Sequence, residues 1–307
     1  MEQIVNSYNL FVDSSHAVTS GSKGDDFHVN LQDSGVHAGD GQIIRVNLQE
    51  FSMKKNFFDV NATNSRFKVY AFAPNGSQLE GSPKTKNIAH LNSNTLVGIA
   101  AEFASEVQAA VEQLTGKECS IEDGFPTEDS PDLPAVISFN LKFTEEHGLR
   151  EGTGNDAGII IAFEEEDDTY QLLGGDRQLS TVTGGTFNSI AIDTTGEFSD
   201  GEQLVTLSCL YPAQKSTISH VYIRAPGTSN TNLETRSMSG STSASASENL
   251  TNHSYILGRA KVNDFDCEFT ASTGRDFFLD LKQKQLNSLE LRLTDAKNRP
   301  LGRTGTH

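Results

Sequence analysis

Short runs of alternating, β-branched or aromatic residues recur along the whole chain, and clusters of Gly, Asn, Asp, Pro and Ser separate them. In one run Ile44, Val46 and Leu48 share one face of an extended chain, and the residues between them are polar. Runs of this length and spacing predict a mainly β protein folded as a sandwich or barrel. The expected strands cover residues 8–12, 27–31, 42–51, 66–72, 135–143, 158–163, 186–192, 204–211, 219–224, 255–262, 266–271, 277–281 and 288–294.

One stretch departs from this pattern, because apolar residues recur every three or four positions from Leu96 to Leu114. That period predicts an amphipathic helix that Ser93 or Asn94 caps and that Gly116 ends. A short helix is expected to end at the Gly174-Gly175 pair. We therefore expect an α+β subdomain, residues 95–175, inserted into a β framework formed by residues 1–94 and 176–307.

The charge balance limits the possible partners. The 307 residues include 24 Lys and Arg against 41 Asp and Glu, a net charge of −17, and residues 1–26 contain a single base, Lys23. A sequence-independent nucleic-acid binder needs a basic surface, so such a role is not expected. The longest apolar stretch, residues 157–163, is far shorter than the roughly 20 residues of a membrane-spanning helix. We expect no membrane insertion and no signal peptide.

The three cysteines, Cys119, Cys209 and Cys267, are an odd set without a CxxC pair. They are typical of independent thiols in a reducing compartment, and Cys209 lies in an apolar run that indicates a core position. Residues 226–249 are poor in large apolar side chains, which indicates a long exposed loop or a segment that orders only against a neighbour.

No motif indicates catalysis. The chain has no HExxH, GxSxG or GxxxxGK[ST] pattern, and the glycines at 152–154 and 183–185 are typical of turns. His28 and His37 could approach Asp25 or Asp26 around a metal, but surface positions are favoured. The acidic run 164–168 is expected to be a solvated helix start rather than a calcium site. We predict no catalytic, cofactor-binding or metal-binding residue, no cofactor, and a protein that is not an enzyme.

Four segments of the sequence, taken in their order along the chain, resemble the sequence motifs of one protein family. They read YNLFVDS at 8–14; FHVNL followed by GQIIRVNLQEFSMKKNFFDVNATNSRF within 27–67; SHVYIR at 219–224 with YILGRAKV at 255–262; and QLNSLELRLTDAKNRPLG at 285–302. As an ordered set they resemble the single jelly-roll penton, or vertex, capsid proteins of virophages, polinton-like viruses and related large DNA viruses of eukaryotes. The closing segment, LxLxLTD followed by a turn and RPL, is the most specific part. Residues 95–175 lie outside the resemblance.

This resemblance implies a structural protein of an icosahedral double-stranded DNA virus, with a single jelly-roll β-sandwich that carries the inserted α+β subdomain. Such a protein forms a homopentamer at the fivefold vertices of the virion and contacts the double jelly-roll major capsid protein. Leu289, Leu291 and Leu293 are then core residues, and the loop 294–300 lies at one end of the barrel. Arg292 and Arg299 would be interface ion pairs or simply exposed.

Two other readings of the chain stay open. One is a minor or cement protein, or a spike base, with the same fold. The other is a carbohydrate-binding β-sandwich, which would need exposed aromatic rings that stack on sugars. The absence of Trp and the presence of only 6 Tyr argue against the second reading.

Overall fold

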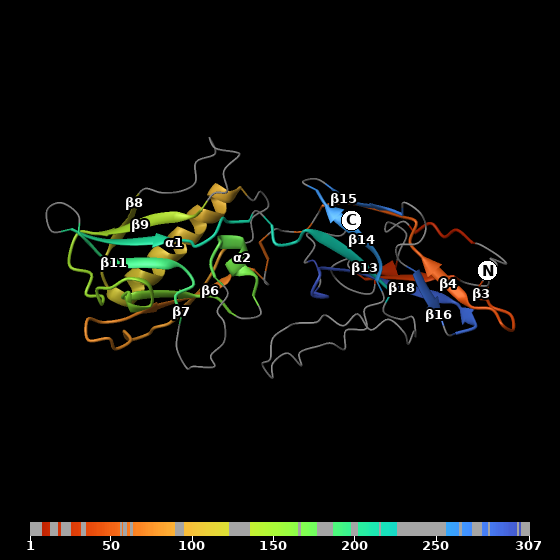
Figure 1. The fold of residues 1–307 in the computed structure, drawn as a ribbon, viewed down its shortest axis with the longest axis horizontal. Coiled ribbons are helices and arrows are strands. Elements are labelled where there is room, and N and C mark those ends of the chain that lie inside the picture. The colour runs from red at the N-terminus through yellow and green to blue at the C-terminus, as the bar shows by residue number, and fades with distance from the viewer. Residues whose placement is uncertain are drawn as a thin grey trace. The chain divides into compact units, whose positions relative to one another are not determined.

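The chain divides into two compact units. Unit 1 is formed by Met1–Phe57 together with Ile218–His307, and unit 2 is the intervening Phe58–Thr217 (Figure 1). Unit 2 therefore begins earlier and ends later than the expected insertion of residues 95–175. The computed structural model describes residues 8–12, 18–19, 26–31, 35–55, 57, 60–61, 64–89, 95–122, 136–164, 167–176, 187–197, 202–214, 216–225, 256–263, 266–271, 278–281, 283–299 and 301.

Unit 1 is built on a seven-stranded antiparallel sheet in which the last strand of the chain lies between early and middle strands. In spatial order its strands are β1 (Val18–Thr19), β2 (Asp26–Asn30), β18 (Ser288–Thr294), β13 (His220–Arg224), β14 (Ile256–Val262), β15 (Asp266–Thr270) and β5 (Glu50–Lys54).

Two shorter strand pairs complete unit 1, namely β4 (Ile44–Asn47) with β16 (Phe278–Leu281) and β3 (Val36–His37) with β17 (Gln285–Leu286). Strand β16 also lies next to β14. Buried side chains from the β4–β16 pair and from the large sheet form one core, including Ile44, Leu279, Leu281, Val221, Ile223, Leu257 and Leu289. Pairing of β2 with β18 and of β4 with β16 brings the two ends of the chain together in both layers, as in a jelly roll. The expected jelly-roll sandwich is confirmed.

The single strand expected over residues 42–51 is wrong, because this run forms two strands in different sheets. β4 pairs with β16, and β5 pairs with β15 at the edge of the large sheet. Between them, half-buried Leu48 packs over Gly258, where an added Cβ would lie 2.5 Å from the Leu48 Cδ2 atom. The alternation shifts by one residue at the bend, because Gln49 and Glu50 are both exposed and the half-buried positions resume at Phe51.

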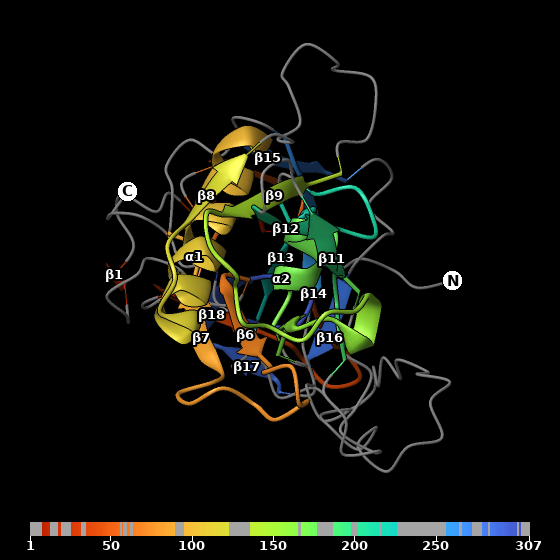
Figure 2. The ribbon, with the colours of Figure 1, turned by 90° about the vertical axis from the view of Figure 1, so that its left-hand side faces the viewer.

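Unit 2 has one long helix and two sheets of its own. The helix α1 is Leu96–Thr115. The first sheet has the order β10 (Ile159–Ala162), β6 (Arg66–Ala71) and β7 (Lys84–Asn87); the second has the order β11 (Ala191–Glu197), β12 (Gln203–Ser208), β9 (Ser138–Phe143) and β8 (Cys119–Glu122). The helix lies beside β8 of the second sheet and beside β6 and β7 of the first (Figure 2).

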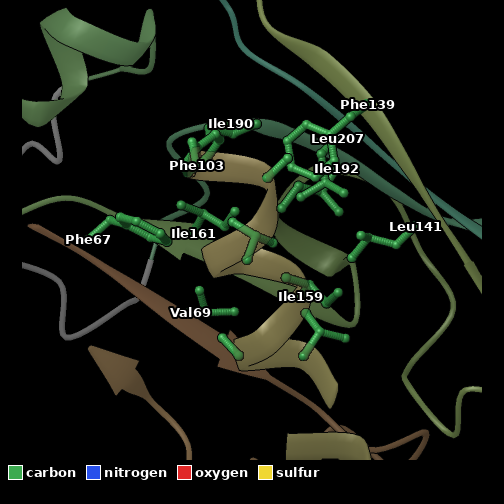
Figure 3. Packing of buried hydrophobic residues seen from close by; sticks show 14 of the residues in the cluster. Phe67, Val69, Phe103, Phe139, Leu141, Ile159, Ile161, Ile190, Ile192 and Leu207 are labelled. Atoms are coloured by element: carbon green, nitrogen blue, oxygen red, sulfur yellow. The ribbon is translucent and has the colours of Figure 1, made fainter. Parts of the chain in front are cut away.

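The helix supplies the centre of a core that both sheets share. Phe103 on α1 meets the rings of Phe67 on β6 and Phe139 on β9 edge-on, with ring centroids 5.0 and 5.8 Å apart (Figure 3). All three side chains are at most 1% exposed. Strands β6 and β12, which the sequence assigns to the framework, therefore contribute to the helix core. That packing explains why unit 2 extends beyond residues 95–175.

The ends of the helices agree with the sequence at their C-termini. Gly116 (φ 68°) ends α1, and Gly174 (φ 76°) ends α2 (Thr169–Leu173), as predicted. At the start of α1 the prediction is wrong, because Thr95 and not Ser93 or Asn94 caps the helix; the Thr95 hydroxyl accepts a hydrogen bond from the Gly98 N–H.

The acidic run 164–168 precedes helix α2 as expected, but its described residues Asp167 and Asp168 are buried rather than solvated. Asp167 and Asp168 are only 6% and 4% exposed. The Asp167 Oδ1 atom accepts hydrogen bonds from the backbone N–H and the hydroxyl of Thr169, at 3.1 and 2.6 Å, so it caps the turn into α2. Burial raises the pKa of Asp167, and the bonds from Thr169 act in the opposite direction. Glu164 is ion-paired with Lys68.

Some expected elements shift, and others are absent. Residues 8–12 form no strand, and the strand expected over 186–192 begins only at Ala191. Of the glycines at 152–154, where a hairpin turn is expected, Gly154 begins a 3-10 turn, Gly154–Asp156. The structure adds β1, β3, β7, β8 and β17, which the sequence does not indicate. The 226–249 loop, the 183–185 turn and Asp25 lie outside the described residues.

Candidate assembly surface

The closing segment of the chain lies at the centre of unit 1. β18 pairs with β2 on one side, with Leu291 opposite Phe27, and with β13 on the other, with Leu293 opposite Ile223. Leu289 and Leu293 are buried, and Leu291 is partly buried against the same core. The most specific part of the sequence resemblance is thus a central strand, where each side chain must fit neighbours on both sides.

The loop after β18 is held by one carboxylate. Asp295 Oδ1 accepts hydrogen bonds from the backbone N–H groups of Lys297 and Arg299, both at 2.8 Å, and Asp295 Oδ2 accepts one from Arg299 Nε at 2.6 Å. Asn298 adopts a left-handed conformation (φ 63°), which Asn tolerates better than most residues. The turn therefore explains three residues of the motif, Asp295, Asn298 and Arg299.

A buried guanidinium lies beneath this loop. Arg224 at the end of β13 is 4% exposed; its Nε donates to the Thr294 hydroxyl at 2.7 Å, and its guanidinium lies over the Tyr222 ring. The Arg224 Nη1 atom has no partner among the described residues. Burial lowers the pKa of Arg224, and the nearby Asp295 carboxylate opposes that shift. The sequence analysis missed this residue, since nothing in HVYIR distinguishes a buried Arg from an exposed one.

The two arginines that the sequence singled out both make pairs within the chain. Arg299 is paired with Asp295, and Arg292 Nη2 lies 3.5 Å from Glu290 Oε1 on the same strand. The expected ion pairs of Arg292 and Arg299 with another molecule stay a prediction.

Exposed large apolar side chains gather in two places among the described residues. In unit 1, Tyr8, Leu10, Phe11 and Val12 are 71, 52, 94 and 41% exposed. In unit 2, Val136, Leu210 and Tyr211 are exposed at one end of the β9–β12 pair, where the Cys209 N–H donates to the Ile137 carbonyl. Ile43 of unit 1 is the remaining exposed large apolar residue of the described part.

The charge of the chain is divided very unevenly between the units. Unit 1 contains 16 Asp and Glu against 15 Lys and Arg, a net charge of −1, whereas unit 2 contains 25 against 9, a net charge of −16. The overall net charge of −17 does not reveal this uneven distribution, which can be calculated only once the boundaries of the two units are known. Copies of unit 1 can therefore approach one another without net repulsion, and copies of unit 2 cannot.

The described residues include no cluster of three or more His, Cys, Asp or Glu side chains that could hold a metal. His28 lies opposite Glu290 on the sheet and His37 opposite Gln285, and both are exposed. All three cysteines are free and buried, which confirms the core position of Cys209. Burial raises the pKa of Cys119 and Cys209 to about 12, so these thiols are protonated at neutral pH.

Across the described part of the chain, every helix is too short or too polar to span a bilayer. No protein-family model matches the sequence, and no curated protein matches it.

Two solved structures are similar to the chain. The selenomethionine-labelled mavirus penton protein is 14% identical, with a TM-score of 0.42, over 92% of this chain and 87% of that one. A chain of the Sputnik virophage, from its cryo-EM structure, is 11% identical, with a TM-score of 0.31, over 89% of this chain and 92% of that one.

Proposed function

We propose that this chain is a structural capsid protein that forms a homopentamer at the fivefold vertices of an icosahedral virion. It contacts the surrounding major capsid proteins through unit 1, needs no cofactor and performs no catalysis. Unit 2 takes no part in closing the ring.

One observation supports this proposal most strongly. The four motif segments that resemble penton proteins fall on unit 1, apart from the last ten residues of the 27–67 segment, which belong to unit 2. Within unit 1 they contribute strands β2, β4, β5, β13, β14, β17 and β18. The segments that carry the resemblance therefore belong mostly to one folded unit with its own core, and they are not scattered strands of unrelated parts.

The distribution of charge gives the proposal a physical basis. A ring of identical chains uses head-to-tail contacts, in which one surface of each copy meets a different surface of the next. Unit 1 has nearly equal numbers of acidic and basic residues, so such contacts can pair opposite charges. Unit 2, with its net charge of −16, favours positions in which the five copies stay apart.

The test is the mass of the purified full-length chain in solution by light scattering, together with electron-microscopy class averages. A mass five times 33.3 kDa with fivefold rings supports the proposal. A stable trimer would overturn the pentamer and would favour a spike-base or cement protein.

A further inference from the structure

The segment of residues 8–12 exposes four of its five side chains as large apolar groups. Scattered exposed apolar residues are normal on a soluble protein, whereas a contiguous group of them marks an interaction surface. Phe11 is 94% exposed, so its ring makes almost no contact with its own chain. The segment belongs to neither a strand nor a helix, which leaves its backbone N–H and carbonyl groups outside the sheets of unit 1.

The charge around this segment fits another copy of unit 1. Residues 1–17 contain two acidic residues, Glu2 and Asp13, and no Lys or Arg. The rest of unit 1 contains 14 acidic and 15 basic residues, a net charge of +1. The segment and the body of unit 1 therefore attract each other weakly, and no net repulsion opposes contact between copies.

We infer that residues 8–12 pack on unit 1 of a second copy of this chain and supply the apolar part of the contact between copies. This inference rests on the proposed self-assembly and names the segment that drives it. The contact is head-to-tail, since the segment of one copy meets a different surface of the next, as a closed ring requires. Burial of the Phe11, Tyr8 and Leu10 side chains provides the driving force.

The exposed apolar residues of unit 2 provide a matched comparison. Leu210 and Tyr211 are 45 and 55% exposed and are of the same residue types as Leu10 and Tyr8. They lie on the unit with a net charge of −16, where a second copy would meet a like charge. Removal of their side chains should therefore leave self-association unchanged.

The experiment compares two double variants of the full-length chain, Tyr8→Ser with Leu10→Ser and Leu210→Ser with Tyr211→Ser. Mass is measured by light scattering and sedimentation over a range of protein concentrations. We expect the first variant to dissociate to 33.3 kDa, or to raise the dissociation constant by about tenfold or more, and the second to match the wild type. The circular dichroism spectrum should stay unchanged in both variants, because all four side chains are exposed. The single variant Phe11→Ser should also weaken the assembly.

The outcomes separate this inference from the proposed function. If the wild type is a pentamer and the variants at residues 8, 10 and 11 remain pentamers, the inference is overturned and the pentamer stands. If the wild type is a trimer that these variants dissociate, the inference stands and the pentamer fails. A wild type that is monomeric at every concentration would overturn the inference, as would an equal loss of assembly in the Leu210 and Tyr211 variant.

Discussion

Two buried polar residues show how single side chains fix local structure in each unit. In unit 1, Asp295 is 7% exposed. Its carboxylate accepts hydrogen bonds from two backbone N–H groups and forms an ion pair with Arg299. In unit 2, His147 is 3% exposed, and its Nδ1 atom accepts a hydrogen bond from the Leu149 N–H at 2.9 Å. Neither role is visible in the sequence, where both residues stand beside other polar residues.

Replacement of Asp295 should destabilise unit 1. Asp295→Ala removes all three hydrogen bonds and leaves two backbone N–H groups without their acceptor, so we expect a loss of about 2–3 kcal/mol in the free energy of unfolding. Arg299→Ala removes only the ion pair and should cost about 1 kcal/mol or less, because Arg299 is partly exposed. Urea unfolding of the two variants measures the difference. Equal losses would show that the backbone contacts of Asp295 contribute nothing.

The buried imidazole of His147 should make unit 2 sensitive to acid. Burial lowers the pKa of His147, and a hydrogen bond to the Thr194 backbone and the charges of Glu151 and Glu146 act in the opposite direction. The unfolded chain therefore takes up this proton near pH 6.5, and the folded chain takes it up only at lower pH. The stability that neutral His147 provides is complete above pH 6.5 and is lost as the pH falls through the folded pKa.

His147→Asn is the corresponding variant, because an amide oxygen can accept the Leu149 hydrogen bond and does not titrate. We expect the wild-type free energy of unfolding to fall more steeply than that of the variant from pH 6.5 to about pH 5. Carboxylates contribute equally to both proteins and cancel in the comparison. Parallel pH profiles would contradict the assignment.

At the scale of elements, the sequence predicts most strands and both helices because their apolar residues follow a simple period. Leu289 and Leu293 alternate on one strand, and Phe103 lies on a face with the helical period. The sequence does not indicate the strands β7 (KTKN) and β8 (CSIE), since each has only four residues and β7 is entirely polar. Their partners β6 and β9 hold them through backbone pairing, and the alternation of their side chains is too short to indicate a strand by itself.

The assignment of strands to units could not be made from the sequence. Phe67 and Val69 on β6 alternate in the same way as Ile44 and Val46 on β4, yet β6 packs on the helix of unit 2 and β4 on the jelly roll. Alternating apolar residues indicate that one face of a strand is buried, but they do not indicate which element packs against that face. The site shows the same limit, since Arg224 donates to Thr294, which is 70 residues further along the chain.

The glycines that end the two helices should respond differently to substitution. Gly116→Ala places a side chain at φ 68° with open space around it, so we expect a cost of about 1–2 kcal/mol. Gly174→Ala adds a collision of Cβ with the Tyr211 backbone carbonyl, which should cost about 1–3 kcal/mol more. Thermal or urea unfolding measures both. An equal effect would mean that the contact between Gly174 and residue 211 relaxes freely.

For the whole molecule, the uneven charge has a consequence for assembly. Five copies of unit 2 would bring together five net charges of −16, and salt screens such repulsion over about 10 Å at 0.1 M ionic strength. The apolar contact of residues 8–12 is not weakened by salt. We expect self-association to strengthen between about 50 and 500 mM NaCl, as measured by sedimentation. Assembly that weakens with salt would show that ion pairs between copies dominate the contact.

The most direct test of the proposed role is an icosahedral reconstruction of the virus particle that contains this chain. The proposal predicts that five copies of unit 1, with the β2–β18 and β4–β16 pairs resolved, fit the density at each fivefold vertex. Density for unit 2 should continue from each copy. A vertex that a different fold fills, with this chain found at another position or absent from the particle, would contradict the assignment.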